Sequence, residues 1–118
     1  MSQELLVAED DPGLAATLRE YLERLGVMVR ATSSAHVTRQ WLQEAGGSLI
    51  LDGSVLGHTG IPLRDLPATR VIIWSGDARL VREARQLGLR AFCKGNLQDF
   101  CGLLREVASR DFVSVPAD

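Results

Sequence analysis

The chain has 118 residues, which is the size of one domain with a single hydrophobic core and no need of disulfide bonds to fold. Hydrophobic residues make up 46% of it and charged residues 24%, as in ordinary globular proteins. The formal net charge of -2 argues against direct binding of nucleic acid. No apolar run approaches the ~18 residues of a membrane span, so no membrane partner is expected.

The stretch Leu5-Leu6-Val7-Ala8 is a continuous apolar run, which predicts a strand covered on both faces. Asp11 before Pro12 is typical of a helix start, with the Asp as cap and the Pro at the first helical position. Apolar residues follow at helical spacing until Gly26, and residues 27–31 predict a second strand.

The middle of the chain predicts a helix and then a third strand. Ser34 and the two residues before it offer caps, and the apolar residues at helical spacing are Val37, Trp41, Leu42 and Ala45. Leu49-Ile50-Leu51 predicts a strand that runs directly into Asp52. Residues 53–67 are rich in Gly and contain two Pro, so we expect a loop with at most one short helical turn.

The last third of the chain predicts two more strands and two more helices. Residues 71–74 form an apolar run that ends at Ser75, and residues 89–93 form another that ends at Lys94. Between them, Asp77 is expected to cap a helix that ends at Gly88 and points inward with Leu80, Val81, Ala84 and Leu87. The final amphipathic helix carries Leu97, Phe100, Cys101, Leu104, Val107 and Ala108.

Strands that alternate with helices predict parallel βαβ units in a doubly wound α/β sheet. We expect this domain to cover residues 1–110, with residues 111–118 as a tail or the start of a linker. Cys93 and Cys101 are too few for a disulfide framework and are expected to be reduced. The N-terminus lacks the basic and apolar regions of an export signal, so a cytoplasmic location is expected.

Polar side chains follow four of the predicted strands. Glu9 and Asp10 follow the first strand, Asp52 the third and Ser75 the fourth. The fifth is followed by Lys94, which is the only lysine among 13 basic residues. Because the carboxyl ends of parallel strands share one edge of the sheet, we expect these side chains to meet. Asp11 is set apart as the helix cap.

This combination of groups predicts phosphoryl chemistry. Three carboxylates in a small space repel one another, and Mg²⁺, which prefers hard oxygen ligands, relieves that repulsion. The metal and an ammonium neutralise phosphate oxygens, while a hydroxyl donates a hydrogen bond to another oxygen. Asp52 ends the central strand and is the expected nucleophile, which would form an acyl phosphate.

The segments "LLVAEDDP", "LILD" with Gly60 eight residues beyond Asp52, "VIIWSG" and "AFCKG" resemble the receiver domain of bacterial two-component response regulators. The resemblance covers residues 4–110 and implies a flavodoxin-like sheet of order 2-1-3-4-5. It implies that Asp52 takes a phosphoryl group from the phosphohistidine of a histidine kinase or phosphotransfer protein. By position, Glu9 and Asp10 match the acids that hold Mg²⁺, and the backbone carbonyl of Ser54 matches a further ligand. Ser75 and Lys94 match the residues that contact the phosphoryl group and switch with it.

The chain departs from the family pattern at four positions. Glu9 stands where the family more often has Asp. Leu56 and Gly95 stand where the family usually has Pro, and Ala91 stands where it has the aromatic switch residue. A glycine peptide is normally trans, so we expect no cis bond after Lys94. The third and fourth helices are expected to be short. The resemblance implies a homodimer that forms on phosphorylation, although a short fourth helix alters the face that such dimers usually use.

Two other functions remain as alternatives to a phosphoacceptor, which is a signalling protein rather than an enzyme. One is a pseudo-receiver, a protein-binding scaffold of the same fold that works without phosphate. The other is an aspartate phosphohydrolase, which is disfavoured because Ser54 stands where that class needs an acid. His36 and His58 have no metal-ligand partner at a useful spacing and are expected on the surface. Trp74 and Phe92 are expected in the core.

Overall fold

The computed structural model describes residues 4–44 and 47–110, and strands alternate with helices along this part of the chain. The strands are β1 (Leu5–Ala8), β2 (Val29–Thr32), β3 (Ser48–Asp52), β4 (Val71–Ser75) and β5 (Arg90–Cys93). The helices are α1 (Pro12–Arg24), α2 (Ala35–Gln43), α3 (Gly53–Thr59), α4 (Ala78–Gln86) and α5 (Leu97–Ser109), with a short 3-10 helix η1 (Leu63–Asp65).

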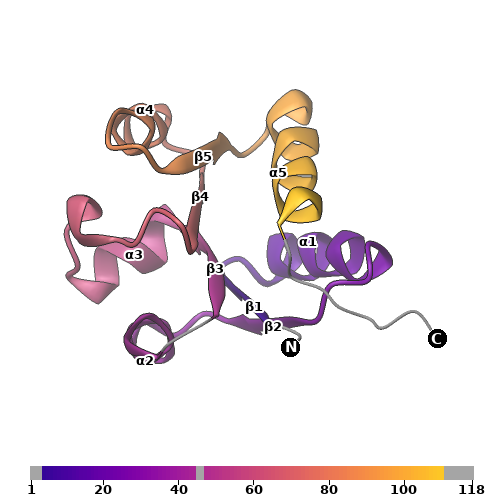
Figure 1. Cartoon of the computed structure of the whole chain (residues 1–118), viewed down its shortest axis with the longest axis horizontal. Helices are drawn as coiled ribbons and strands as arrows, with labels where there is room; N and C mark the ends of the chain where they lie inside the picture. Colours follow the sequence, from indigo (N-terminus) through magenta and orange to yellow (C-terminus); the bar gives the residue numbers. More distant parts are fainter. Residues whose placement is uncertain (1–3, 45–46, 111–118) are drawn as a thin grey trace.

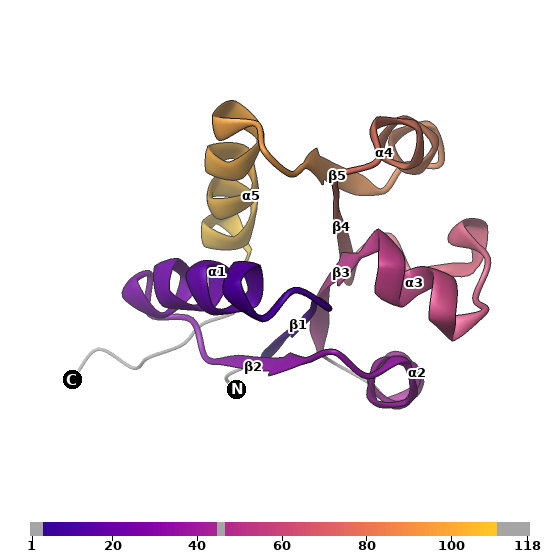
Figure 2. The same cartoon turned by 180° about the vertical axis from the view of Figure 1, so that it is seen from behind.

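All five strands pair in parallel in one sheet of order β2-β1-β3-β4-β5. Helices α1 and α5 cover one face of the sheet, and α2, α3 and α4 cover the other (Figures 1 and 2). This arrangement confirms the predicted doubly wound, flavodoxin-like fold. The order reverses at β1, so the crevice of such a sheet lies at the carboxyl ends of β1 and β3.

A hydrophobic core fills each side of the sheet. Leu5, Val7 and Ile50 pack with Leu18 and Leu103 on the side of α1 and α5. On the other side, the alternate strand residues Leu6, Leu49 and Leu51 pack with the apolar faces of the three remaining helices. The helix residues of this core include Val55, Val81 and Ala84. Central strands buried on both faces explain why their sequences are continuous apolar runs.

Helix α3 is longer than the single turn that the sequence predicts, although it is still short. It begins directly after β3 because the Asp52 carboxylate accepts hydrogen bonds from the backbone N–H groups of Ser54 (3.0 Å) and Val55 (3.3 Å). This cap outweighs the low helix propensity of two glycines in the segment. Gly60 ends the helix in the left-handed region with a φ of 73°.

Three further sequence predictions are corrected in detail. The second strand lies at Val29–Thr32 rather than 27–31. Leu87 was expected to face inward, but it caps the end of α4 and is 50% exposed. Leu97 opens the first turn of α5, before the helix reaches the core, and is 76% exposed. Ala45 of the second predicted helix and residues 111–118 lie outside the described residues.

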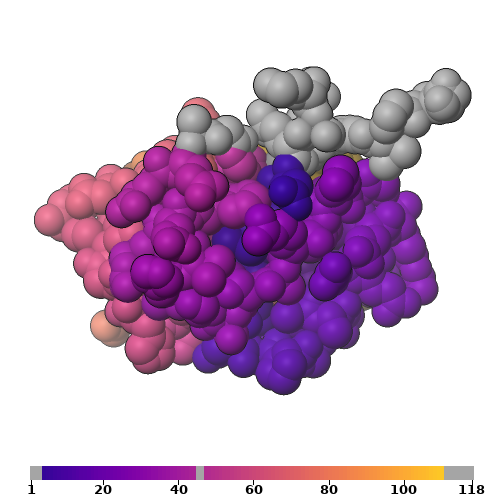
Figure 3. Space-filling model, turned by 90° about the horizontal axis from the view of Figure 1, so that it is seen from below, coloured from indigo at the N-terminus to yellow at the C-terminus, as the bar shows by residue number. Residues whose placement is uncertain are grey.

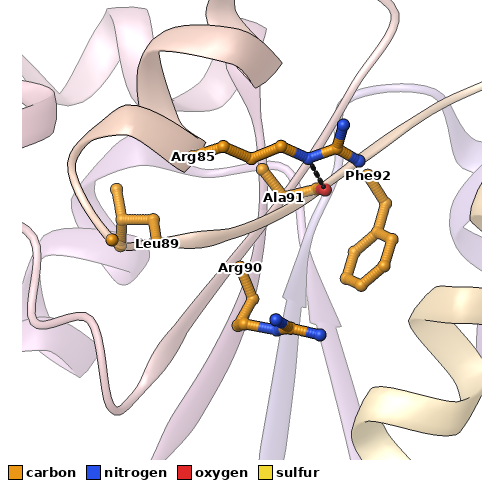
Figure 4. A pocket seen from close by; sticks show the side chains of 6 residues that line it. Arg85, Leu89, Arg90, Ala91 and Phe92 are labelled. Atoms are coloured by element: carbon orange, nitrogen blue, oxygen red, sulfur yellow. Dashed lines mark hydrogen bonds between the residues drawn. The ribbon is translucent and has the colours of Figure 1, made fainter.

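Strand β5 is one edge of the sheet, and side chains cover its outer backbone groups. A pocket of about 440 Å³ follows this edge (Figure 4). Arg85 reaches across it and donates from Nε to the carbonyl oxygen of Ala91 at 2.9 Å. The Asp99 carboxylate accepts the N–H of Cys93 at 2.6 Å and also pairs with Arg85 at 3.3 Å. This ion pair therefore occupies the positions that a further strand would use.

Strand β2 forms the opposite edge. Residues of the first half of the chain make up most of the face seen from below (Figure 3). Arg30 of β2 lies over the ring of Trp41 from α2, with its guanidinium carbon 5.6 Å from the ring centroid.

Within the described residues, no helix has the length and apolar character needed to cross a membrane.

Candidate functional site

The carboxyl ends of the strands bring the predicted polar residues to one edge of the sheet. Glu9 and Asp10 follow β1, Asp52 is the last residue of β3, Ser75 is the last residue of β4, and Lys94 follows β5. Glu9 and Asp52 are buried, with 2% and 5% of their surface exposed, whereas Asp10 is exposed. The parallel register aligns these positions, because Asp52 pairs with Trp74 and Ser75 pairs with Cys93.

The three carboxylates and the lysine form one cluster. Glu9, Asp10 and Asp52 each offer an oxygen, and these oxygens lie within 4.8 Å of one another. The Lys94 ammonium makes an ion pair with Glu9 Oε1 at 2.5 Å and a second ion pair with Asp52 Oδ1. A side chain that follows β5 therefore closes a site whose acids lie at the ends of β1 and β3.

The environment of the cluster shifts the pKa of three of its groups. Burial raises the pKa of the Glu9 carboxyl, and the nearby Asp52 charge adds to this, against the lowering effect of Lys94. Burial acts to lower the pKa of the Lys94 ammonium, but its hydrogen bonds to Asp52 and Glu9 outweigh burial and raise it. The pKa of Asp10 is lowered, chiefly because it accepts a hydrogen bond from Glu9.

These residues fit a small divalent cation. Glu9 Oε1 is buried and, within the described part of the chain, has no well-aligned hydrogen-bond donor beside its ion pair with Lys94. The charged form of Glu9 is disfavoured here, first by burial and also by repulsion from the Asp52 carboxylate, so its pKa is raised. A cation of higher charge relieves the same repulsion, and three oxygen ligands suit Mg²⁺.

Ser54 lies in the first turn of α3. Its N–H donates to Asp52, and its carbonyl oxygen accepts a hydrogen bond from Nδ1 of His58 at 2.8 Å. His58 is exposed, as expected, but it lies in α3 rather than in a loop. The contact follows from helix geometry, because residues four apart share one side of a helix.

Ser75 is 3% exposed, and its Oγ accepts the N–H of Asp77 at 3.0 Å. Gly53 makes room for this hydroxyl. A Cβ atom at Gly53 would lie 2.9 Å from Ser75 Oγ and 2.7 Å from Leu80 Cδ2. The glycine beside Asp52 therefore lets the start of α3 approach the end of β4, a role that the sequence alone does not reveal.

Trp74 and Phe92 lie in the core as predicted, with 4% and 9% of their surface exposed. Trp74 also borders the site, because the Lys94 ammonium lies 5.2 Å from the centroid of its ring. The Lys94–Gly95 peptide is trans, and Gly95 adopts a left-handed φ of 78°. Cys93 and Cys101 are both free thiols.

No protein-family model matches the chain. The DNA-binding transcriptional regulator NtrC of Azospirillum brasilense is 30% identical over 94 residues, which cover 75% of this chain and 20% of that protein. The chain therefore spans about a fifth of the length of this curated relative.

Solved structures give a broader likeness. A response regulator receiver protein from Burkholderia phymatum matches with a TM-score of 0.67 and 21% identity, over 98% of this chain and 100% of that one. A response regulator in red light signaling of R. palustris matches with a TM-score of 0.62 and 21% identity, over 98% and 99%. The BeF3-activated DrrB receiver domain matches with a TM-score of 0.62 and 19% identity, over 91% and 95%.

The chain is thus a doubly wound α/β domain with an acidic cluster at the carboxyl edge of its sheet. Its fold is that of the receiver domains of response regulators, and the predicted resemblance is confirmed.

Proposed function

We propose that this chain is a phosphoacceptor receiver domain in which Asp52 accepts a phosphoryl group from the phosphohistidine of a histidine kinase or phosphotransfer protein. The observation that carries the proposal is the cluster of Glu9, Asp10 and Asp52, whose oxygens lie within 4.8 Å of one another. The Lys94 ammonium pairs with two of the three acids. A structural ion pair needs neither the third carboxylate nor its exposure to solvent.

Asp52 is the nucleophile in this proposal. A carboxylate oxygen of Asp52 attacks the phosphorus atom, and a P–O bond forms as the P–N bond to the donor imidazole breaks. The departing imidazole nitrogen keeps the electron pair of the broken bond and takes up a proton, which leaves an acyl phosphate on Asp52. The hydrogen bonds from Ser54 and Val55 to Oδ2 hold the carboxylate in one orientation for this attack.

Glu9, Asp10 and Asp52 would hold Mg²⁺, with the Ser54 carbonyl as the further ligand that the resemblance implies. When bound, the metal supplies positive charge against the negative oxygens of the phosphoryl group. Lys94 supplies a second positive charge and is free to leave the carboxylates for the phosphate. Ser75 would donate its hydroxyl hydrogen to a phosphoryl oxygen. Its hydrogen bond with the N–H of Asp77 uses Oγ as the acceptor and does not occupy this hydrogen.

The test is phosphorylation by a small donor. The protein is incubated with Mg²⁺ and acetyl phosphate, and its intact mass is measured. The wild type is expected to gain one phosphoryl group, whereas Asp52→Asn gains none. A wild type that neither gains mass nor binds Mg²⁺ would contradict the proposal and favour the pseudo-receiver. The cytoplasmic location and dimerisation on phosphorylation stay predictions.

A further inference from the structure

We propose that Trp74 is a positioning residue that holds the Lys94 ammonium at Asp52, and that its indole ring senses when the ammonium leaves. The proposal rests on the phosphoacceptor function above and names a residue of that site. Ala91 stands where the family has its aromatic switch residue, and it is 2% exposed and carries no ring that could respond to changes at the site. The aromatic ring that borders the lysine belongs instead to the neighbouring strand β4.

The ammonium of Lys94 has neighbours of two kinds. On one side it meets Glu9 Oε1 at 2.5 Å and Asp52 Oδ1. On another it lies 5.2 Å from the centroid of the Trp74 ring, within the range of a cation–π contact. Only 15% of the Lys94 side chain is exposed, so water screens this contact little. The ring therefore favours the charged lysine at the position where it faces Asp52.

Trp74 is held firmly enough to act as a fixed surface. Its backbone pairs with Asp52 on β3 and with Phe92 on β5. Its ring packs against Phe100 of α5 at 6.2 Å between centroids, and Phe100 in turn meets Tyr21 of α1 at 5.4 Å. The position of the ring is thus set by the sheet and by two helices rather than by Lys94.

The indole N–H of Trp74 gives a further reason to assign this residue a role at the site. Its Nε1 is buried and has no hydrogen-bond partner in the described part of the chain. A buried N–H without a partner costs stability, and a phenylalanine at this position would avoid that cost. Tryptophan differs from phenylalanine in its larger and more electron-rich ring face, which is the better partner for a cation.

The first experiment examines the contact without phosphorylation. Tryptophan emission of the metal-free protein is recorded for the wild type and Lys94→Met, each with and without Trp74→Phe, which isolates the signal of Trp74 from that of Trp41. We expect Lys94→Met to shift the emission only where Trp74 is present. Emission from Trp74 that is the same with and without the Lys94 ammonium would overturn the proposal, whether or not the protein accepts phosphate.

The second experiment measures the rate of phosphorylation by acetyl phosphate with Mg²⁺. We expect Trp74→Leu to slow it about tenfold, which corresponds to about 1.4 kcal/mol, and Trp74→Phe, which keeps an aromatic ring with a weaker attraction for the cation, to recover part of the rate. Leu103→Ala is the control for lost packing, because Leu103 is fully buried in the same core but lies on α5. It should lower stability and keep the rate.

The outcomes separate the two proposals. Wild-type protein that takes no phosphate while Asp10 and Asp52 still bind Mg²⁺ would count against the phosphoacceptor function, and the emission experiment would still decide the contact. Equal rates for wild type and Trp74→Leu, or a loss in Trp74→Phe as large as in Trp74→Leu, would overturn the positioning role. In the phosphorylated wild type, the emission of Trp74 should change, and Asp52→Asn should show no such change.

Discussion

Glu9 is a buried acid whose charge opposes folding. Burial is the main cause of its raised pKa, so the folded protein binds a proton at Glu9 more tightly than the unfolded chain does. The stability that protonation of Glu9 contributes is fully present at a pH below 4.5, the ordinary pKa of a glutamate side chain. It is lost as the pH rises through the raised pKa of Glu9 in the folded protein. The charged form of Glu9 therefore lowers the stability of the fold, which is expected of a ligand and not of a packing residue.

Glu9→Gln should for this reason stabilise the metal-free protein at pH 7 and weaken Mg²⁺ binding about tenfold or more. Urea unfolding in EDTA at several pH values measures the first effect. The difference in midpoint between variant and wild type should be small near pH 4 and should grow toward pH 7, because only the wild type gains a charge. A variant less stable than the wild type at pH 7 would contradict this account.

At the scale of single residues, the strand ends were the informative positions. Glu9, Asp10, Asp52 and Lys94 could be brought together from the sequence because parallel strands fix where their last residues lie. The roles of Gly53 and Trp74 could not. They depend on how closely α3 approaches β4 and on the path of a long lysine side chain, and neither distance is encoded in the spacing of residues.

At the scale of elements, helix caps determined where helices form at positions that helix propensity alone did not settle. The glycines of 53–60 argued for a loop, but a carboxylate at the end of β3 supplied the cap that starts α3. Conversely, helical spacing predicted an inward face for Leu87 and Leu97, yet both lie at helix ends that extend beyond the core. Spacing reports the side of a helix and says nothing of how far the helix overlaps the sheet.

Arg70 should matter for the end of α2. Its guanidinium donates to the carbonyl oxygens of Gly47 (2.7 Å), Trp41 (3.0 Å) and Leu42 (3.3 Å). Arg70→Ala removes a donor from two carbonyls at the end of α2 and from the carbonyl of Gly47 beyond it, although Trp41 keeps its bond from the Glu44 N–H, so we expect a loss of about 2 kcal/mol in the free energy of unfolding. Urea denaturation measures it. Arg82→Ala, at an exposed position of α4, is the matched control and should change stability by less than about 0.5 kcal/mol.

The edge of β5 is protected by Arg85 and Asp99. The double variant Arg85→Ala, Asp99→Ala frees the carbonyl of Ala91 and the N–H of Cys93, and exposed edge groups of this kind pair with other strands. We expect self-association that increases with protein concentration, measured by sedimentation velocity. Arg90→Ala, which removes a side-chain ion pair with Glu106 and no edge cap, should stay like the wild type.

At the scale of the whole molecule, the site lies at the carboxyl ends of strands that separate the two hydrophobic cores. The alternation of strands and helices predicted the α/β class, but periodicity does not say which strands are neighbours. The order β2-β1-β3-β4-β5 came from the resemblance of the strand-end motifs, and the structure bears it out.

Because β1, β3 and β5 all contribute to the cluster, a ligand bound there should stabilise the entire fold. Mg²⁺ at a hundred times its dissociation constant would add about 2.7 kcal/mol, which should raise the Tm by several degrees. Thermal unfolding with and without Mg²⁺ measures the shift. Asp10→Asn, which changes an exposed carboxylate, should lose most of the Tm shift that Mg²⁺ gives the wild type, each variant being compared with its own metal-free Tm. A full shift in this variant would exclude Asp10 as a ligand.

The two oxygens of Asp52 face different neighbours. Oδ2 accepts the N–H groups at the start of α3, and Oδ1 meets Lys94. In an acyl phosphate, one carboxylate oxygen is bonded to phosphorus and the other remains a carbonyl oxygen that still accepts hydrogen bonds. With the phosphoryl group on Oδ1, the α3 side would keep its anchor in both covalent forms, and rearrangement would begin on the β5 side alone. An asymmetric carboxylate of this kind would give the signal a direction across the sheet from its first step.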